Sequence, residues 1–157
     1  MEESLHLYHT GFHELRSPLC WKRRYKRMAQ LLLFNIRGDK LRRIRMLSFK
    51  LGLRCVAVAQ EDYSKTLGAL CGRAEDIPAV DTDDAPAFGG EMLVMDGLSS
   101  AQFHGLLDSL RRERAAVALK AVVTESNARW SAARLYRELS AEHEAMEKLK
   151  GKSIHRI

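Results

Sequence analysis

The sequence lacks most of the features that identify an enzyme or a membrane protein. Its 157 residues contain no glycine-rich phosphate loop, no metal-ligand spacing and no nucleophile with a recognisable base. Only three cysteines are present, too few for an oxidised scaffold in a chain of this size, so a reduced cytoplasm fits better. No apolar run approaches the roughly 20 residues of a membrane helix. We therefore expect no membrane association, no cofactor, no metal site and no catalytic residues.

What the sequence does contain is the same order of elements twice: strand, helix, strand, helix. We expect a first βαβα unit over residues 28–72 and a second over residues 91–150, opened by the apolar runs 31–34 and 92–95. Both runs are nearly uniform, which is typical of strands covered on both faces. Each unit is too small to be a domain. The sequence thus predicts one α/β domain with a four-stranded, mostly parallel sheet and a long C-terminal helix, with the strand order left open.

Capping residues indicate where these elements begin and end. Gly52 is typical of a left-handed helix end, and a buried strand over residues 55–59 follows it. Asp62 is expected to cap a helix that runs to Leu70. In the second unit, residues 99–102 have the pattern of a capping box, and the last helix is expected over residues 130–150.

Three segments have compositions unlike the two units. Residues 73–90 are acidic and proline-containing, which predicts an exposed linker. A calcium loop beginning at Asp81 is disfavoured, because the required glycine and glutamate are missing from its sixth and twelfth positions. Residues 1–27 show no helix or strand period and end before Met28, so we expect a disordered segment or an artefactual extension; the alternative is a basic arm for nucleic acid. Residues 151–157 form a tail.

Several stretches of the chain resemble a known family, the domain of unknown function 3783, which is bacterial and common in Gram-positive anaerobes. The resemblance rests on residues 91–97, on residues 118–124 with Asn127 and Trp130, and on residues 135–139 before Glu142 and His143. The first unit is similar to the usual N-terminal half of such proteins, so the resemblance covers nearly everything from residue 28 on. Because the family is uncharacterised, the resemblance implies no activity.

Positive charge is concentrated before and within the first predicted helix. Residues 22–54 contain twelve lysines and arginines against a single acid, in a chain with a net charge of +6. On a basic helix within residues 37–54, the candidate phosphate contacts are Arg42, Arg43 and Arg45. The alternative is a solvated helix face. We favour that alternative, because no nucleic-acid-binding motif accompanies the basic residues and only 7% of the chain is aromatic.

A second candidate site follows from the expected topology, since open α/β sheets bind ligands at the carboxyl ends of parallel strands. The candidate binding residues at that edge are Asp62, Tyr63, Asp96, Lys120, Thr124 and Asn127. Helix capping is the alternative for Asp62 and Asn127. Lys120 is expected to lie at a strand start or on an edge of the sheet. A phosphoacceptor receiver domain is disfavoured, because the first strand ends in Asn35 and not in an acidic pair.

These observations favour a small cytoplasmic, non-catalytic module that binds or regulates an unknown protein partner. A nucleic-acid-binding protein that uses the basic helix at residues 37–54 is the second hypothesis. A small enzyme that uses the strand-end carboxylates is the third. Trp130 is expected to anchor the last helix on the sheet. The pattern leaves the oligomeric state open.

Overall fold

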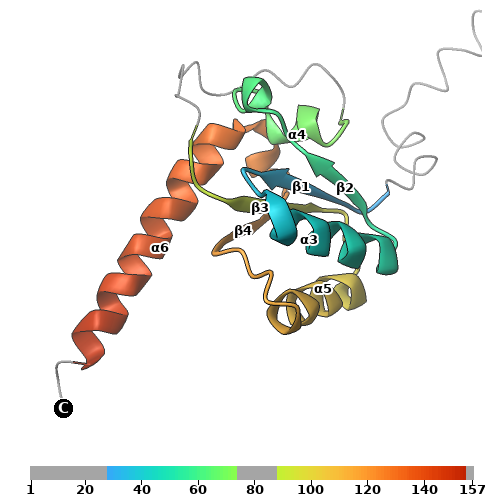
Figure 1. Ribbon diagram of the computed structural model, residues 1–157. Helices are drawn as coiled ribbons and strands as arrows, with labels where there is room; N and C mark the ends of the chain where they lie inside the picture. The colour runs from blue at the N-terminus through green and yellow to red at the C-terminus, as the bar shows by residue number, and fades with distance from the viewer. Residues whose placement is uncertain (1–27, 74–87, 155–157) are drawn as a thin grey trace, which may run out of the picture.

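The computed structural model describes residues 28–73 and 88–154 (Figure 1), whose strands form a single sheet. The strand order is β2-β1-β3-β4. The bounds of the strands are Gln30–Phe34 for β1, Arg54–Ala57 for β2, Met92–Asp96 for β3 and Leu119–Val122 for β4. Every residue of the two central strands is buried, as their uniform apolar runs predicted. The predicted α/β class and the four-stranded sheet are therefore confirmed.

The sheet is mixed, and mostly parallel. β1 pairs with β2 in parallel and β3 pairs with β4 in parallel, whereas β1 and β3 are antiparallel, with Leu32 opposite Val94 at their centre. The carboxyl ends of the first unit's strands therefore lie at one end of the sheet and those of the second unit at the other. The expectation that all strand ends meet at one edge is wrong, because two parallel pairs are joined by one antiparallel pair.

Each face of the sheet is covered by helices (Figure 1). Helices α3 (Gly38–Lys50) and α5 (Ser100–Arg112) pack against one face, and α4 (Leu67–Leu70) and α6 (Ala132–Ile154) pack against the other. Two short 3-10 helices, η1 (Gln60–Asp62) and η2 (Asn127–Arg129), follow the edge strands. The burial of both sheet faces gives two core layers within one small domain.

The helix boundaries agree with the sequence in part. Gly52 has a φ of +68° and the N–H of Leu53 donates to the carbonyl of Ser48 at 2.8 Å, so the predicted left-handed stop is confirmed. The capping box at the start of α5 is also present. The predicted start of the helix after Asp62 is wrong. Asp62 is the last residue of η1, and the helix that ends at Leu70 is the single turn of α4, which Thr66 caps. The last helix is longer than expected and includes the first residues of the predicted tail.

The two units are joined on the α6 side by matched backbone hydrogen bonds. The N–H of Leu67 donates to the carbonyl of Trp130 at 2.9 Å, and the N–H of Ala132 donates to the carbonyl of Lys65 at 3.2 Å. These bonds flank a single antiparallel bridge. The starts of α4 and α6 are thereby held side by side.

Both described ends of the predicted linker pack against the domain. Phe88 is buried and stacks on Tyr136 and Tyr63, with ring centroids 4.2 and 4.5 Å apart. Asn35 donates from Nδ2 to the carbonyl of Phe88 at 2.7 Å. Arg73, at the other end, forms an ion pair with a buried carboxylate. The described ends of the predicted linker are thus packed against the domain and are not part of an exposed segment; residues 1–27, 74–87 and 155–157 lie outside the described residues.

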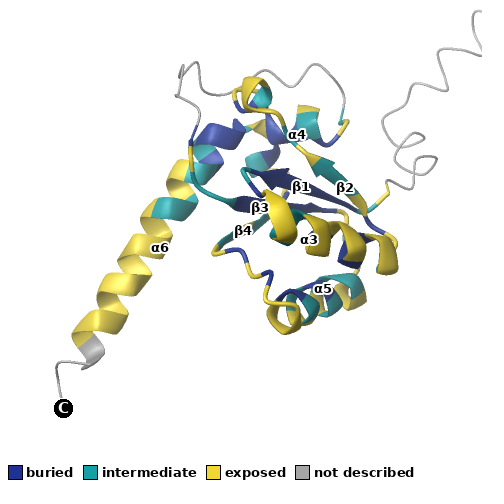
Figure 2. Cartoon of the chain, viewed as in Figure 1, coloured by how far each residue is buried: buried dark blue, intermediate teal, exposed yellow. Residues whose placement is uncertain are grey.

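The C-terminal part of α6 projects away from the rest of the fold (Figure 2). Leu135 is its last buried residue, and every residue from Ala141 to Lys152 is exposed. Although α6 is long, no helix within residues 28–73 and 88–154 is apolar enough over sufficient length to span a membrane.

Candidate functional site

The residues predicted at the strand ends lie in two separate places. Tyr63 is buried, its hydroxyl donates to Oδ1 of Asn35 at 3.1 Å, and its ring packs on Phe34. Burial raises the pKa of Tyr63. The neighbouring Asp62 forms an ion pair with Lys65 at 2.8 Å. Tyr63 therefore serves the packing of the first unit, whereas Asp62 forms only an exposed local ion pair.

Asp96 lies at the other end of the sheet and is 2% exposed. Its Oδ1 accepts a hydrogen bond from Nη2 of Arg73 at 2.6 Å, and its Oδ2 accepts one from Nε2 of Gln30 at 3.1 Å. Gln30 also donates to the carbonyl of Cys71. A cavity of about 510 Å³ lies beside Asp96. Both carboxylate oxygens are nevertheless occupied by partners that tie β1 to the segment after α4.

Thr124 and Asn127 bond to each other. The N–H of Thr124 donates to Oδ1 of Asn127 at 2.7 Å, and the N–H of Asn127 donates to Oγ1 of Thr124 at 3.2 Å. This is the reciprocal arrangement of a capping box. The side-chain amide of Asn127 also donates to the carbonyl of Val122 at 3.0 Å. The two side chains thus stabilise the turn before η2. The expectation that Asn127 caps the last helix is wrong, because α6 begins at Ala132 and the N–H of Arg134 donates to Oγ of Ser131 at 3.1 Å.

Lys120 lies on β4, an edge strand, as expected from the sequence. Its Nζ donates to the carbonyl of Val117 at 2.5 Å. Burial lowers the pKa of Lys120, and the charge of Arg111 lowers it further. Within residues 28–73 and 88–154, no group of three or more metal-ligating side chains is close enough to hold a metal ion.

The outer face of α3 is a different kind of surface. It presents an aromatic and a thioether side chain among cations, and we call Arg42, Arg45, Met46, Phe49 and Lys50 the α3 face. Phe49 is 84% exposed and Met46 is 57% exposed. Since residues three and four apart are neighbours on a helix, these side chains form one continuous surface.

The three candidate phosphate contacts have different surroundings. Arg42 forms an ion pair with Asp39 one turn earlier, and both side chains are exposed. Arg43 donates from Nη1 to the carbonyl of Glu113 at 2.6 Å, so it holds the end of α5. Arg45 has no hydrogen bond or ion pair with the described part of the chain. Arg45 is therefore the most available of the three, and Arg43 is structural.

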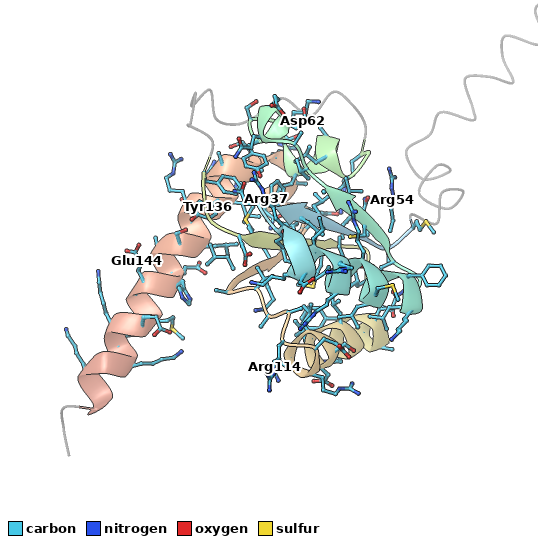
Figure 3. The ribbon with its side chains drawn as sticks, in the orientation of Figure 1. Arg37, Arg54, Asp62, Arg114, Tyr136 and Glu144 are labelled. Atoms are coloured by element: carbon cyan, nitrogen blue, oxygen red, sulfur yellow. The ribbon has the colours of Figure 1, made fainter. Side chains whose placement is uncertain are left out.

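A groove runs between the α3 face and the end of α5. Gln102 donates from Nε2 to the carbonyl of Leu51 at 3.1 Å, which places the start of α5 beside the end of α3, so the two helices are antiparallel. The groove has a volume of about 380 Å³ and is lined by Asp39, Arg42, Arg43, Met46, Leu47, Lys50 and Glu113. Figure 3 shows Arg37 and Arg54 at the two ends of α3, and Arg114 beyond α5.

Comparison with protein families gives a match in the second unit. Residues 91–146 match the model of a family described as Domain of unknown function (DUF3783). The chain carries a DUF3783 domain. The resemblance seen in the sequence is confirmed for this part of the chain. No curated protein and no solved structure matches the chain.

The DUF3783 domain contributes only one wall of the groove. It contains β3, α5, β4 and most of α6, whereas α3 belongs to the first unit. The sequence interpretation missed Phe49 and Met46 because it considered only the cations of this helix. A signal was present: Leu41, Ile44, Leu47 and Leu51 already form the buried stripe, and neither Phe49 nor Met46 falls on it.

Proposed function

We propose that this protein is a non-catalytic binding module that holds single-stranded nucleic acid on the α3 face. The observation that carries the proposal is Phe49, which is 84% exposed and lies one helical turn from Arg45. Proteins that bind single strands combine cations that follow the backbone with aromatic rings on which bases stack. The α3 face has both elements on one helix.

The cations are placed to contact more than one phosphate. Arg42 and Lys50 are separated by about 12 Å along the helix axis, with Arg45 between them. Within the described residues, Arg45 and Lys50 have no acidic partner. The pair between Arg42 and Asp39 is exposed, and such pairs contribute little, so a phosphate can replace the carboxylate at small cost.

The exposed aromatic side chain favours nucleic acid over an acidic protein surface. Stacking of one base on an aromatic ring is worth about 1–3 kcal/mol, which the cations alone would not supply. Met46 extends the apolar surface next to the ring. Phe49 and Met46 are both exposed and lie three residues apart on α3, so together they form a small apolar patch among the cations.

The strand-end residues support a non-catalytic role over a small enzyme. Asp96, Thr124 and Asn127 are all engaged in hydrogen bonds within the fold. A general base must be free to reach a substrate proton. The proposal further takes the protein to be bacterial, as the family resemblance implies, and cytoplasmic, in line with a chain of 157 residues that has only three cysteines. It treats the two units as an internal repeat, supported by their matched element order.

The test is fluorescence anisotropy with a labelled single-stranded oligonucleotide of about twelve nucleotides, in RNA and DNA forms. Replacing Phe49 with alanine should weaken binding by about 5- to 150-fold, the equivalent of one lost stacking contact. Replacing Arg45 with alanine should lower the salt slope by about 0.7, the value for one phosphate contact on a single strand. Arg129→Ala, an exposed arginine outside the α3 face, is the matched control and should change neither quantity.

Three outcomes would overturn the proposal. One is the absence of binding at 100 µM protein in physiological salt. Another is salt-dependent binding that Phe49→Ala leaves unchanged, which would indicate a partner recognised by charge alone. The third is binding that is lost when Lys22, Arg23 and Arg24 are replaced by alanine but is retained in the Phe49 and Arg45 variants.

A further inference from the structure

The free end of α6 continues an apolar stripe that has no cover within the described residues. Leu135 and Leu139 pack against the core on one face of the helix. Met146 and Leu149 lie on that same face, because the steps of four, seven and three residues keep to one side of a helix. They are 57% and 64% exposed. The face that packs on the sheet therefore extends beyond the end of the sheet, as Figure 2 shows for the exposed part of α6.

The outer part of α6 has no packing partner within the described residues. We call residues 141–152 the α6 arm; all of them are exposed, and Glu144 is labelled on it in Figure 3. Isolated helices shorter than about 12–15 residues are marginal in water, and most helical stability comes from packing an apolar face. The exposed Met146 and Leu149 provide such a face.

The charges of two copies of the arm are complementary in the antiparallel orientation only. Acidic residues come first along the arm and basic residues last: Glu142, Glu144 and Glu147 are followed by Lys148, Lys150 and Lys152. Lys150 also forms an ion pair with Glu147 of its own helix at 3.0 Å, but both side chains are exposed and such a pair contributes little. Two parallel arms would place acid opposite acid and base opposite base. Two antiparallel arms can place Glu142 opposite Lys150 and Glu144 opposite Lys148 on both sides of their centre.

We propose that the α6 arm pairs with the arm of a second copy of this chain in antiparallel orientation. The charges select the register, since pairing Glu142 with Lys150 and Glu144 with Lys148 places Met146 opposite Met146 of the second copy on a two-fold axis. Two equivalent pairs result: Glu142 of each copy faces Lys150 of the other copy. The overlap of the two arms is about 17 Å long, the length of one arm. This proposal is independent of the nucleic-acid function, since α3 is on the other face of the sheet.

The interface is small, so the dimer should be weak. A pair of twelve-residue arms buries less than the roughly 1,200 Å² of a standard interface. We expect a dissociation constant of about 10–100 µM. Sedimentation velocity from about 5 to 500 µM protein measures it. The sedimentation coefficient of the full chain should rise with concentration toward that of a dimer.

Variants of the arm test the apolar stripe and the charge pattern separately. Met146→Glu should raise the dissociation constant at least tenfold, whereas Ala141→Glu, which introduces the same side chain on the opposite side of the helix, should leave it unchanged. Glu142→Lys and Lys150→Glu should each weaken self-association. An equimolar mixture of the two single variants, and the chain that carries both, should dimerise as the unmodified chain does, because each restores opposite charges.

Each contrary result would overturn the proposal. A chain that stays monomeric at 500 µM shows that the stripe is covered by another part of the same chain or by a different protein. A dimer that survives Met146→Glu uses another surface. A dimer that the charge exchange fails to restore does not have the antiparallel register.

Discussion

Phe88 offers the sharpest test of how the two units are held together, because a segment expected to be solvent-exposed places this ring in the core. Its centroid lies 4.2 Å from that of Tyr136, 4.5 Å from that of Tyr63 and 5.8 Å from that of Phe34. Tyr136 belongs to the second unit and the other two rings to the first. Phe88 therefore connects the start of α6 to β1 and to the chain after η1.

Replacing Phe88 with alanine should cost about 3–5 kcal/mol of unfolding free energy. Truncation of a buried phenylalanine is in this range, since it removes apolar burial and leaves a cavity. Each aromatic pair adds about 0.5–1.5 kcal/mol beyond area burial, which places the expected loss in the upper half of the range. A loss of about 4 kcal/mol corresponds to a fall in melting temperature of about 8–16 °C for a chain of this size.

Urea unfolding followed by circular dichroism measures this loss directly. Phe49→Ala is the matched control, because it makes the same change at a side chain that is 84% exposed. Its unfolding free energy should stay within about 0.5 kcal/mol of the unmodified chain. If Phe88→Ala cost less than about 1 kcal/mol, or if both variants cost the same, the aromatic stack would not join the units and the reasoning would be refuted.

Two further predictions concern Trp130 and Tyr63. Trp130 is half-buried against the core, and the guanidinium of Arg134 lies 4.3 Å from its ring centroid. Trp130→Ala should therefore lower the unfolding free energy by about 2–3 kcal/mol in the same urea assay. A loss near zero would show that Trp130 does not anchor the helix. Burial raises the pKa of Tyr63 above 10.0. The stability that neutral Tyr63 contributes is therefore complete below pH 10 and is lost as pH rises through the pKa of the folded state. Tyr63→Phe should show a shallower loss above pH 10, and an identical pH profile would contradict this.

The central strands and their burial could be predicted from sequence, but their relative direction could not. The apolar runs 31–34 and 92–95 are covered on both faces, and this pattern is the same for parallel and antiparallel neighbours. Direction is decided by backbone pairing between β1 and β3, which leaves no mark on the side chains. The separation of Asp62 from Asp96 follows from that one antiparallel pairing.

The candidate site was predicted in part. The basic helix was identified from its composition, and the edge position of Lys120 was expected, whereas the cap of the last helix is Ser131 and not Asn127. Phe88 was missed because the surrounding acidic segment dominated the composition of residues 73–90. The structural role of Arg43 was also beyond the sequence, since its partner carbonyl is 70 residues away, on Glu113.

Photo-crosslinking tests most directly whether a base contacts the α3 face. A single-stranded oligonucleotide that contains 5-iodouridine is irradiated with the full chain, and crosslinked tryptic peptides are identified by mass spectrometry. Because Arg45 and Lys50 are cleavage sites, Phe49 lies on the short peptide Met46–Lys50. We expect the crosslink on this peptide, at Phe49, and we expect Phe49→Ala to abolish it while the melting temperature stays the same. A crosslink confined to peptides of residues 1–27, or to no peptide at all, would contradict the proposed binding surface.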